Sequence, residues 1–418
     1  MQSDPDDHSS TSPPDTRAVI GTATPRSRTV GPDPMADFIR PTDFEVATCA
    51  VLGLLPPEPM PVAPSARNAI DDAIRPALVD GPCFVTFSGG RDSSAVLAAA
   101  TDLARREGLP LPIPVTKVYP DHPESDESEW QRMVIDHLGL TEWLRVEFRD
   151  EHELLGSAAK QSLLLRGLMW PPALQVQSHW YEILGAGSVL TGEGGDEVLA
   201  SRRITPVRVL PRRRRPTMAN TRRAVRSILP APMREAAIVR QWSQIPQPWL
   251  RPEVRRRALE LLAGEMAAQP LRYDKATWWI ARRRAWTVYQ HNHARVAADH
   301  GITAIDPLLD RGFLAALARL GGRLGFTGRT ATMVALFADL LPSEVLRRRS
   351  KAAFNGAHAG ASLKAFAEDW DGSGVDPDLV DIGNLRREWL SDRPSPTTAL
   401  LLQNAWLHTK RDGEVGLR

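Results

Sequence analysis

The 418-residue chain contains little cysteine, little lysine and no long apolar segment. Its two cysteines, Cys49 and Cys83, are too few for a disulfide framework or a four-cysteine zinc site. No run of about 18 uncharged apolar residues is present, and the opening residues MQSDPDD lack the basic and apolar parts of a signal peptide. These absences argue against membrane-spanning and disulfide-rich secreted proteins. We therefore expect a soluble, cytoplasmic protein without a membrane partner.

The composition is that of a globular protein, with 42% hydrophobic and 24% charged residues. A length of 418 residues favours two domains, each able to bury a core. The charge is uneven, because residues 1–80 carry a net charge of −6 and residues 201–300 one of +16. Such a basic block could bind RNA, an acidic peptide or a polyphosphate. Solvated helix faces explain it more simply, and we do not expect a nucleic-acid partner.

The sequence divides into four parts. Residues 1–36 are rich in Ser, Thr, Pro, Asp and Gly, which is typical of a disordered tail. Residues 37–79 form a short lead-in, with a helix over 65–75 that we expect Pro76 to end. Residues 80–200 alternate strands with helices, and residues 201–418 are helical almost throughout.

The alternation in residues 80–200 predicts a Rossmann-like α/β domain with a parallel sheet. We expect strands at 83–87, 113–119, 144–148 and 188–191, and helices at 93–107, 127–138 and 173–186. In the following all-α domain the clearest helices are 254–268 and 276–299. Its segment 202–226 holds ten arginines and is expected to be a mobile loop.

The string SGGRDSS, Ser88 to Ser94, follows the first strand and opens a helix. Its glycines allow a ligand to approach the backbone, and the helix N-terminus and hydroxyl groups favour an anion. The string differs from a P-loop, because no Lys-Ser or Lys-Thr pair follows the glycines. Asp92 suits a phosphate loop if it holds a divalent cation that bridges to the phosphates.

A second glycine-rich string, TGEGGDE, spans Thr191 to Glu197 and follows the fourth strand. Loops at the carboxyl ends of neighbouring parallel strands converge on one crevice. We therefore expect Asp196 to approach Asp92, so that the two carboxylates can share one Mg²⁺.

Together the two strings resemble the synthetase domain of asparagine synthetases and of their relatives, the β-lactam synthetases and lasso-peptide cyclases. Further similarity lies at Asp126–Glu129, at Pro307–Asp310 and at Arg349–Lys351, so the resemblance covers residues from about 80 to 355. It implies an ATP pyrophosphatase fold that uses ATP and Mg²⁺. A carboxylate attacks the α-phosphorus to give an acyl-adenylate, which an amine or ammonia then converts into an amide with release of AMP.

The resemblance also implies roles for individual residues. Glu193 would act as an acid/base group beside the amine, and Lys351 would stabilise negative charge in the transition state. Asp92 and Asp196 would hold Mg²⁺. The ATP-binding residues would be Thr86, Ser88, Gly89, Gly90, Asp92, Ser93, Ser94, Val118, Thr191 and Gly192.

Several departures from the family pattern bear on the substrates. Position 2 is Gln2 rather than the nucleophilic cysteine of glutamine-dependent members, and about 80 residues precede the first loop, so we do not expect glutamine hydrolysis by this chain. The stretch 302–307 lacks the Glu and Arg that asparagine-forming members carry, which argues against aspartate. β-Lactam synthetases have Tyr where this chain has Glu193. Free ammonia, a separate glutaminase and an amine on the substrate remain open as nitrogen sources.

The sequence thus predicts an AMP-forming carboxylate–amine ligase acting on a small-molecule or peptide carboxylate. One alternative is a macrocyclase or another natural-product tailoring ligase, for which the partner would be a precursor peptide. A second is a nucleotide-binding scaffold without turnover, which the intact acidic residues and Lys351 argue against. A tRNA-modifying pyrophosphatase would not be expected to carry the second string or the helical region.

Overall fold

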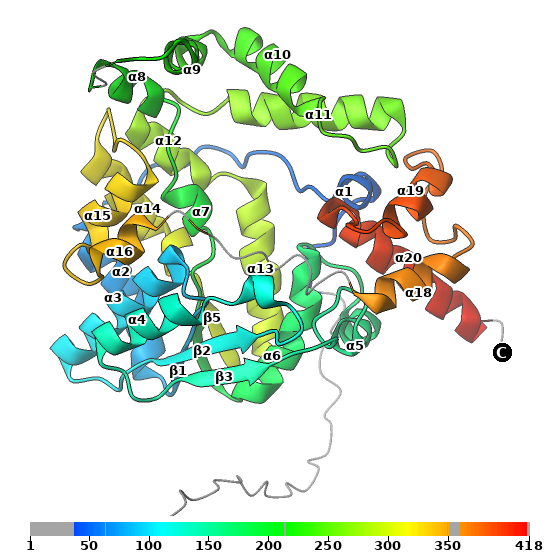
Figure 1. Ribbon diagram of the computed structural model, residues 1–418, viewed down its shortest axis with the longest axis horizontal. Helices are drawn as coiled ribbons and strands as arrows, with labels where there is room; N and C mark the ends of the chain where they lie inside the picture. Colours follow the sequence, from blue (N-terminus) through cyan, green and yellow to red (C-terminus); the bar gives the residue numbers. More distant parts are fainter. Residues whose placement is uncertain (1–36, 63, 213–214, 349, 351–359, 416–418) are drawn as a thin grey trace, which may run out of the picture.

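The structure, a computed structural model, describes residues 37–62, 64–212, 215–348, 350 and 360–415. At its centre lies a five-stranded sheet in the order β3-β2-β1-β4-β5, in which every neighbouring pair is parallel (Figure 1). The fold class predicted from the sequence is confirmed. The strands are β1 (Cys83–Thr86), β2 (Ile113–Val118), β3 (Leu144–Glu147), β4 (Gly187–Leu190) and β5 (Ile302–Ile305).

The crossover helices cover both faces of the sheet. The chain moves one way from β1 to β3 through α3 (Arg91–Glu107) and α4 (Ser128–Leu138), and then returns to β4 past α6 (Gln177–Leu184). Because parallel crossovers are right-handed, this reversal puts α6 on the face opposite to α3 and α4. The strand order reverses between the neighbouring strands β1 and β4, and such a reversal is where open α/β sheets bind ligands.

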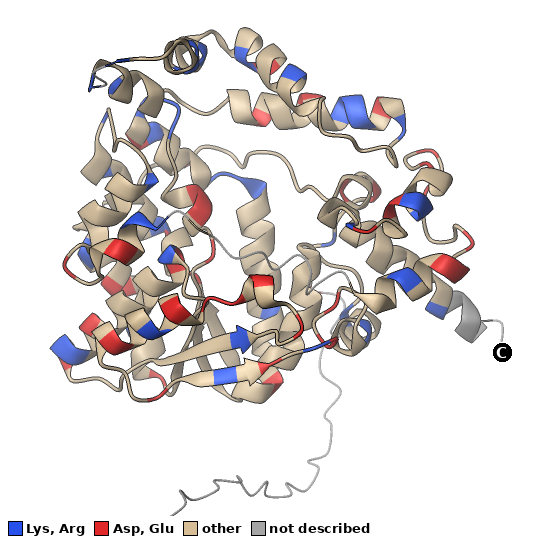
Figure 2. Cartoon of the chain, in the orientation of Figure 1, with Lys and Arg blue, Asp and Glu red and all other residues tan. Residues whose placement is uncertain are grey.

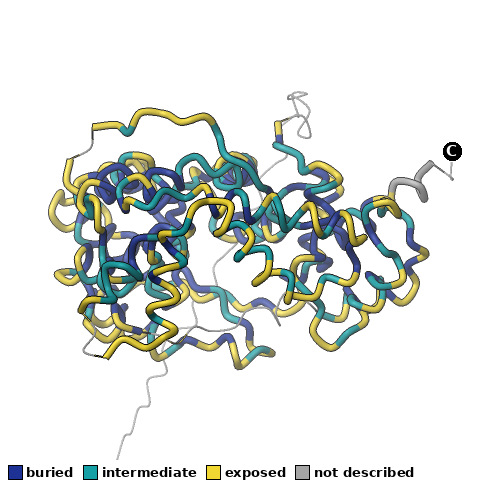
Figure 3. The backbone as a smooth tube through the Cα atoms, turned by 90° about the horizontal axis from the view of Figure 1, so that it is seen from above, coloured by how far each residue is buried: buried dark blue, intermediate teal, exposed yellow. Residues whose placement is uncertain are grey.

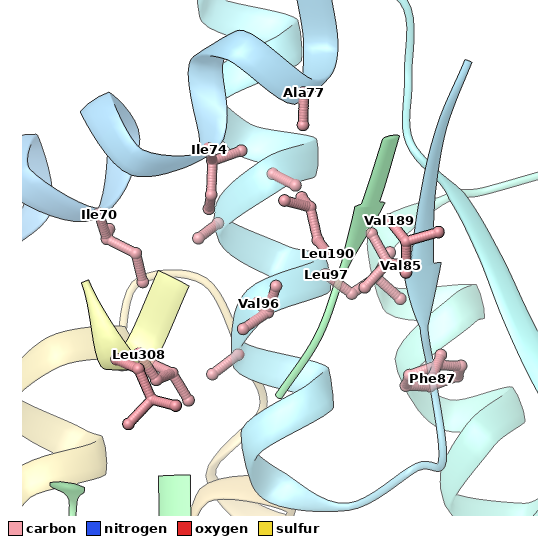
Figure 4. Close-up of a cluster of buried hydrophobic side chains, with 14 of the residues drawn as sticks. Ile70, Ile74, Ala77, Val85, Phe87, Val96, Leu97, Val189, Leu190 and Leu308 are labelled. Atoms are coloured by element: carbon pink, nitrogen blue, oxygen red, sulfur yellow. The ribbon is translucent and has the colours of Figure 1, made fainter. Parts of the chain in front are cut away.

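The main core lies between the sheet and helices α2 (Ala66–Val79) and α3. Figure 4 shows buried side chains of this cluster, with Leu190 of β4 near Leu97 of α3. The labelled residues are Ile70, Ile74 and Ala77 of α2, Val96 and Leu97 of α3, Val85 and Phe87 at β1, Val189 and Leu190 of β4, and Leu308. Burying each large aliphatic side chain contributes about 1.5–3 kcal/mol. This core fixes the carboxyl ends of β1 and β4, from which the two glycine-rich strings emerge.

A second buried cluster joins elements from both ends of the chain. It includes Trp249, Trp370 and Trp389, and Figure 3 shows the corresponding buried segments as a separate group beside the main core. Its helices are α1 (Asp43–Thr48), α5 (Ser157–Arg166), α18 (Ala361–Asp369), α19 (Ile382–Trp389) and α20 (Ala399–Val415).

The remaining helices follow the sheet domain in sequence. Those near the main core are α7 (Gly195–Val198), α12 (Tyr273–Ile280), α13 (Arg284–Ala298), α14 (Arg311–Gly321), α15 (Arg329–Phe337) and α16 (Ser343–Arg347). An outlying layer, at the top of Figure 1, is formed by α8 (Thr205–Val209), α9 (Met218–Ile228), α10 (Ala231–Trp242) and α11 (Pro252–Ala267).

Two helix predictions differ from the structure. Helix α2 continues past Pro76 to Val79, because Ala77 and Leu78 gain full burial, which offsets the hydrogen bond that proline cannot make. The expected helix over 276–299 is broken between α12 and α13. The backbone of Arg283 pairs with Leu54 at that break and so leaves the helical path.

The predicted arginine-rich loop at 202–226 is wrong for the described residues of that segment. Most of them form α8, a 3₁₀ turn and the greater part of α9, and the side chain of Thr217 accepts a hydrogen bond from the Asn220 N–H to cap α9. Figure 2 shows basic residues spread over this outlying layer, with acidic residues among them on α10 and α11. Among the described arginines of this segment, Arg208 lies on α8 and Arg222, Arg223 and Arg226 lie on α9, whereas Arg202 is buried before α8.

The structure also adds strand β5, which pairs with β4 from Gly187↔Ile302 to Leu190↔Ile305. Its four residues are too few to stand out between helices in the sequence. The expected disordered tail at 1–36 and Lys351 lie outside the described residues. Among the helices that the structure describes, none is long and apolar enough to cross a membrane.

Candidate active site

A cavity of about 740 Å³ opens at the carboxyl ends of β1, β2 and β4. This volume falls within the range of ligand-binding sites. Both glycine-rich strings line it, and the other walls come from the end of β2, from α6 and from α13. The cavity therefore lies at the position that the reversal of the sheet predicts.

The first glycine-rich string is held in a compact turn by its own hydroxyl groups. The Ser93 hydroxyl lies 3.1 Å from the Ser88 hydroxyl and donates to the Gly90 carbonyl over the same distance. Gly89 has a φ of +80°, and a Cβ there would lie 2.9 Å from a side-chain atom of Gln131. Gln131 in turn donates to the Ser88 carbonyl at 3.2 Å. The turn thus leads directly into the N-terminus of α3, a geometry suited to an anion.

The second string packs against the first so closely that only glycine fits. A Cβ on Gly195 would lie 2.3 Å from Cγ of Asp92, and a Cβ on Gly192 would lie 2.7 Å from the Ser93 nitrogen. Gly194 has a φ of +79°, which L side chains rarely adopt. The glycines of the second string therefore allow its backbone to contact the first, which brings Asp196 to the same edge as Asp92.

Arg329, at the start of α15, bridges the two acidic residues. It donates to Oδ2 of Asp92 at 2.5 Å and forms a second ion pair with Asp196. Burial raises the pKa of the Asp92 carboxyl, while Arg329 acts in the opposite direction. Oδ1 of Asp92 is buried and has no hydrogen-bond partner among the described residues.

The carboxylates of Asp92 and Asp196 therefore both contact the Arg329 guanidinium. Oδ1 of Asp92 remains without a hydrogen-bond partner among the described residues. Oxygen ligands of this kind are what Mg²⁺ prefers, and it usually takes one or two carboxylates together with phosphate oxygens. The residues present fit such an ion.

A second buried ion pair fixes the outer edge of the first loop. Arg348 donates to Oε2 of Glu127 at 2.9 Å and to the Gly89 carbonyl at 3.0 Å, and its guanidinium lies 4.5 Å from the ring centroid of Trp130. This pair connects the segment after α16 to the first glycine-rich string. The neighbouring Ser350 also lines the cavity.

Glu193 faces the open cavity, so water reaches its side chain although protein surrounds it on the other sides. This environment raises the pKa of the Glu193 carboxyl, first by loss of solvation and then by the negative charge of Asp306, while His293 opposes the shift. A carboxyl group with a raised pKa in a cleft is suited to proton transfer near neutral pH.

Lys117, near the end of β2, faces Glu193 across the cavity. Its ammonium donates to Oε1 of Gln177 at 3.0 Å and lies 4.9 Å from the ring centroid of Trp180. Burial lowers its pKa to about 7, and the charge of Glu193 partly counters this effect.

The sequence matches the family model of asparagine synthase over residues 65–407. The chain belongs to the asparagine synthase family. This family consists of ATP-dependent ligases that form amides. A comparison with curated proteins gave no match.

The asparagine synthase fold of this chain brings most of the predicted site residues to one cavity. Those that line it are Thr86, Ser88, Gly90, Asp92, Ser93, Thr191, Gly192, Glu193 and Asp196. Gly89 and Ser94 belong to the first string but are not among the residues that line the cavity, and Ser94 is fully buried. Val118 does not line the cavity, because side chains alternate along β2 and Lys117 and Tyr119 occupy the inward face.

Several residues of this asparagine synthase site were not predicted from the sequence. Arg329 belongs to no local motif and reaches the site only through the fold. Lys117 is one of six lysines and lies near the end of a strand. These two features are what could have indicated it in the sequence. Tyr181, Tyr289 and His293 come from helices on which they read as ordinary core residues.

Proposed function

We propose that this chain is an AMP-forming ligase, which adenylates a carboxylate with ATP and transfers the acyl group to an amine or ammonia. The observation that carries the proposal is the contact between the two glycine-rich strings, which directs Asp92 and Asp196 to one cation while Glu193 faces the cavity beside them. The division into an ATP-pyrophosphatase domain at 80–200 and a helical domain at 201–418 is part of the same proposal.

In this proposal the first string binds the β- and γ-phosphates of ATP through its backbone N–H groups and the hydroxyls of Ser88 and Ser93. Asp92 and Asp196 would hold Mg²⁺, which neutralises phosphate charge when bound. Arg329, now paired with both carboxylates, is placed to contact the phosphates instead. The adenosine would lie along Thr86 and the end of β2.

The carboxylate substrate attacks the α-phosphorus, and the P–O bond to pyrophosphate breaks. The resulting acyl-adenylate is then attacked by the amine, the bond to AMP breaks, and a proton leaves the nitrogen. Glu193 is proposed to receive or relay a proton at this step, for which its raised pKa is suited. Lys351 is carried over from the family resemblance as the group that stabilises the transition-state charge.

The test is pyrophosphate release from ATP and Mg²⁺ across a panel of amino acids, dicarboxylic acids and peptides, each with and without an added amine. We expect release that depends on a particular carboxylate and is lost in Asp92→Asn. Tight ATP binding with no release from any carboxylate would favour the scaffold alternative.

The identity of the acyl substrate decides between a small-molecule ligase and a peptide macrocyclase. A peptide that loses the mass of one water on reaction would support the macrocyclase. Conversely, release with a free amino acid and no peptide product would support the small-molecule ligase. Added glutamine tests the predicted inability of this chain to release ammonia from it.

A further inference from the structure

Three residues from separate elements meet at the wall of the cavity next to Glu193. Tyr181 lies on α6, His293 on α13 and Asp306 directly after β5. All are buried, with exposed fractions of 1%, 3% and 7%. Neither glycine-rich string contains them, and the proposed mechanism does not use them.

Their side chains form a linear array. The Tyr181 hydroxyl lies 2.5 Å from Nε2 of His293, and Nδ1 of His293 lies 3.6 Å from Oδ2 of Asp306. If the hydroxyl donates to Nε2, the ring proton is on Nδ1 and faces the Asp306 carboxylate. Apart from this ion-pair contact, Nδ1 has no hydrogen-bond partner among the described residues.

Two aromatic side chains contact the imidazole. The ring of Tyr289 stacks on it at 5.1 Å between centroids, whereas Tyr181 approaches it through the hydroxyl, with 6.1 Å between centroids. The hydroxyl of Tyr289 donates to Oδ1 of Asp306 at 3.3 Å. The hydroxyl–imidazole–carboxylate order is therefore fixed by packing as well as by polar contacts.

The array is connected to the loop that carries Glu193. The Thr191 hydroxyl donates to Oδ1 of Asp306 and accepts from the backbone N–H of Glu193 at 3.2 Å. Tyr181 and His293 both line the cavity, whereas Asp306 lies behind them. Tyr181 thus lines the same cavity as Glu193, beside which the amine is proposed to react.

We propose that Tyr181 is a catalytic residue that accepts the proton of the attacking amine, with His293 and Asp306 as the positioning residues that make this transfer favourable. This inference rests on the proposed function. A hydroxyl bonded to an imidazole that a carboxylate orients is a recurring arrangement for moving a proton from a hydroxyl to a base. Here the hydroxyl passes on a proton from the amine and forms no covalent bond.

The proposed step moves one proton from the amine through Tyr181 to His293. The amine nitrogen forms a bond to the acyl carbon, and the bond to AMP breaks with its electron pair on the phosphate oxygen. The nitrogen gives a proton to Oη of Tyr181 while the original hydroxyl proton moves to Nε2 of His293. Asp306 stabilises the imidazolium, which later returns the proton to solvent through Tyr181.

The hydroxyl acts as a relay and not as a standing phenolate. Burial and the negative charges of Asp306 and Glu193 raise the pKa of Tyr181, so it keeps its proton at neutral pH. A relay needs an acceptor behind the hydroxyl, which His293 provides. Glu193, which lies next to this array, remains the second acid/base group beside the amine.

The test separates adenylation from amide formation in Tyr181→Phe, His293→Gln and Asp306→Asn. ATP–pyrophosphate exchange with the accepted carboxylate reports adenylation, and amide yield is measured with a primary alkylamine and with hydroxylamine. We expect Tyr181→Phe to retain exchange and to lose alkylamide formation by about 100-fold or more. Hydroxylamine is already neutral near pH 7 and depends less on a base, so hydroxamate formation should recover a large part of the loss.

His293→Gln and Asp306→Asn should show the same pattern, with a smaller loss in Asp306→Asn because the imidazole remains.

Tyr119→Phe is the matched control, since the Tyr119 hydroxyl contacts another buried histidine, His152, at 3.1 Å. It should change exchange and amide formation by the same factor. A parallel fall of both activities in Tyr181→Phe, or unchanged alkylamide formation, would overturn the inference. Absence of exchange in the wild type with every carboxylate would refute the proposed function itself.

Discussion

The two ends of the cavity are built in different ways. The phosphate-loop end consists of two strings, 88–94 and 191–197, each a run of consecutive residues. Their glycines permit close contact between the two backbones. The opposite end is assembled from single side chains on α6, α13 and the segment after β5. Binding by backbone N–H groups requires consecutive residues in a special conformation, whereas side-chain chemistry can be gathered from any element that the fold brings near. This difference predicts that substitutions at the two ends affect different partial reactions.

Asp92→Asn should have the largest effect and should fall on adenylation. It removes one of the two carboxylates that converge on a cation, so we expect pyrophosphate exchange to fall by about 1,000-fold or more. Exchange measured at saturating Mg²⁺ checks this, with circular dichroism to verify folding. Retained exchange would show that Asp92 does not serve the phosphate-loop end.

Gly195→Ala should also impair adenylation, because the added Cβ would lie 2.3 Å from Cγ of Asp92 and would displace that carboxylate. We expect a loss of about 100-fold in exchange, since a misplaced catalytic group commonly costs that much. Gly264→Ala on α11 is the matched control, because a Cβ there meets no atom closer than 4.0 Å. The control should leave exchange unchanged and stabilise the helix by about 0.5–1 kcal/mol.

Glu193→Gln should impair amide formation, because Glu193, although it belongs to the second string, is proposed to act on the amine. Exchange should persist, while amide formation falls by about 100-fold, because a general acid/base group contributes about that factor or more. Single-turnover amide yield from preformed acyl-adenylate is the measurement. Equal loss of both reactions would remove the distinction between the two ends.

Lys117→Met should have the smallest effect, on stability and its pH dependence. Burial lowers the Lys117 pKa to about 7 from an ordinary value of 10.5, so the unfolded chain binds more protons between these values. This contribution makes stability rise with pH from about 7 to 10.5.

Below about pH 7 the full cost of burying the ammonium is present in the wild type, and Lys117→Met removes it. Since Lys117 is partly accessible from the cavity, we expect a gain of about 1–2 kcal/mol at about pH 6. The gain should shrink by about pH 9. Urea unfolding of both proteins at these pH values gives the comparison, and a gain independent of pH would contradict the assigned cause.

Much of the fold and one end of the site could be predicted from the sequence, and the reasons are physical. Strands β1 to β4 are short apolar runs separated by clear helical periods, so their alternation could be recognised. Thr86 ends one such strand, and Asp92 and Asp196 belong to the strings 88–94 and 191–197 that follow β1 and β4. Each expected residue of those strings is found at or next to the cavity, although their roles remain predictions.

The other end could not be predicted because its residues carry no local pattern. Tyr181 and His293 lie 112 positions apart and meet only through the packing of α6 on α13. Val118 was expected in the site, but the pleat of β2 turns Lys117 inward instead. The predictions that Pro76 ends its helix and that 202–226 is a loop were wrong for a related reason. Burial of Ala77 and Leu78 extends the first helix, and the Thr217 cap helps to form α9, and neither effect is visible in the composition.

The account depends most on the formation of an acyl-adenylate at the contact between the two glycine-rich strings. The most direct test is product analysis with ATP labelled in its α-phosphate, incubated with the carboxylate panel and hydroxylamine. We predict AMP and a hydroxamate in equal amounts for the accepted carboxylate, and neither product in Asp92→Asn. Formation of ADP in place of AMP, or AMP that appears equally without any carboxylate, would contradict the account.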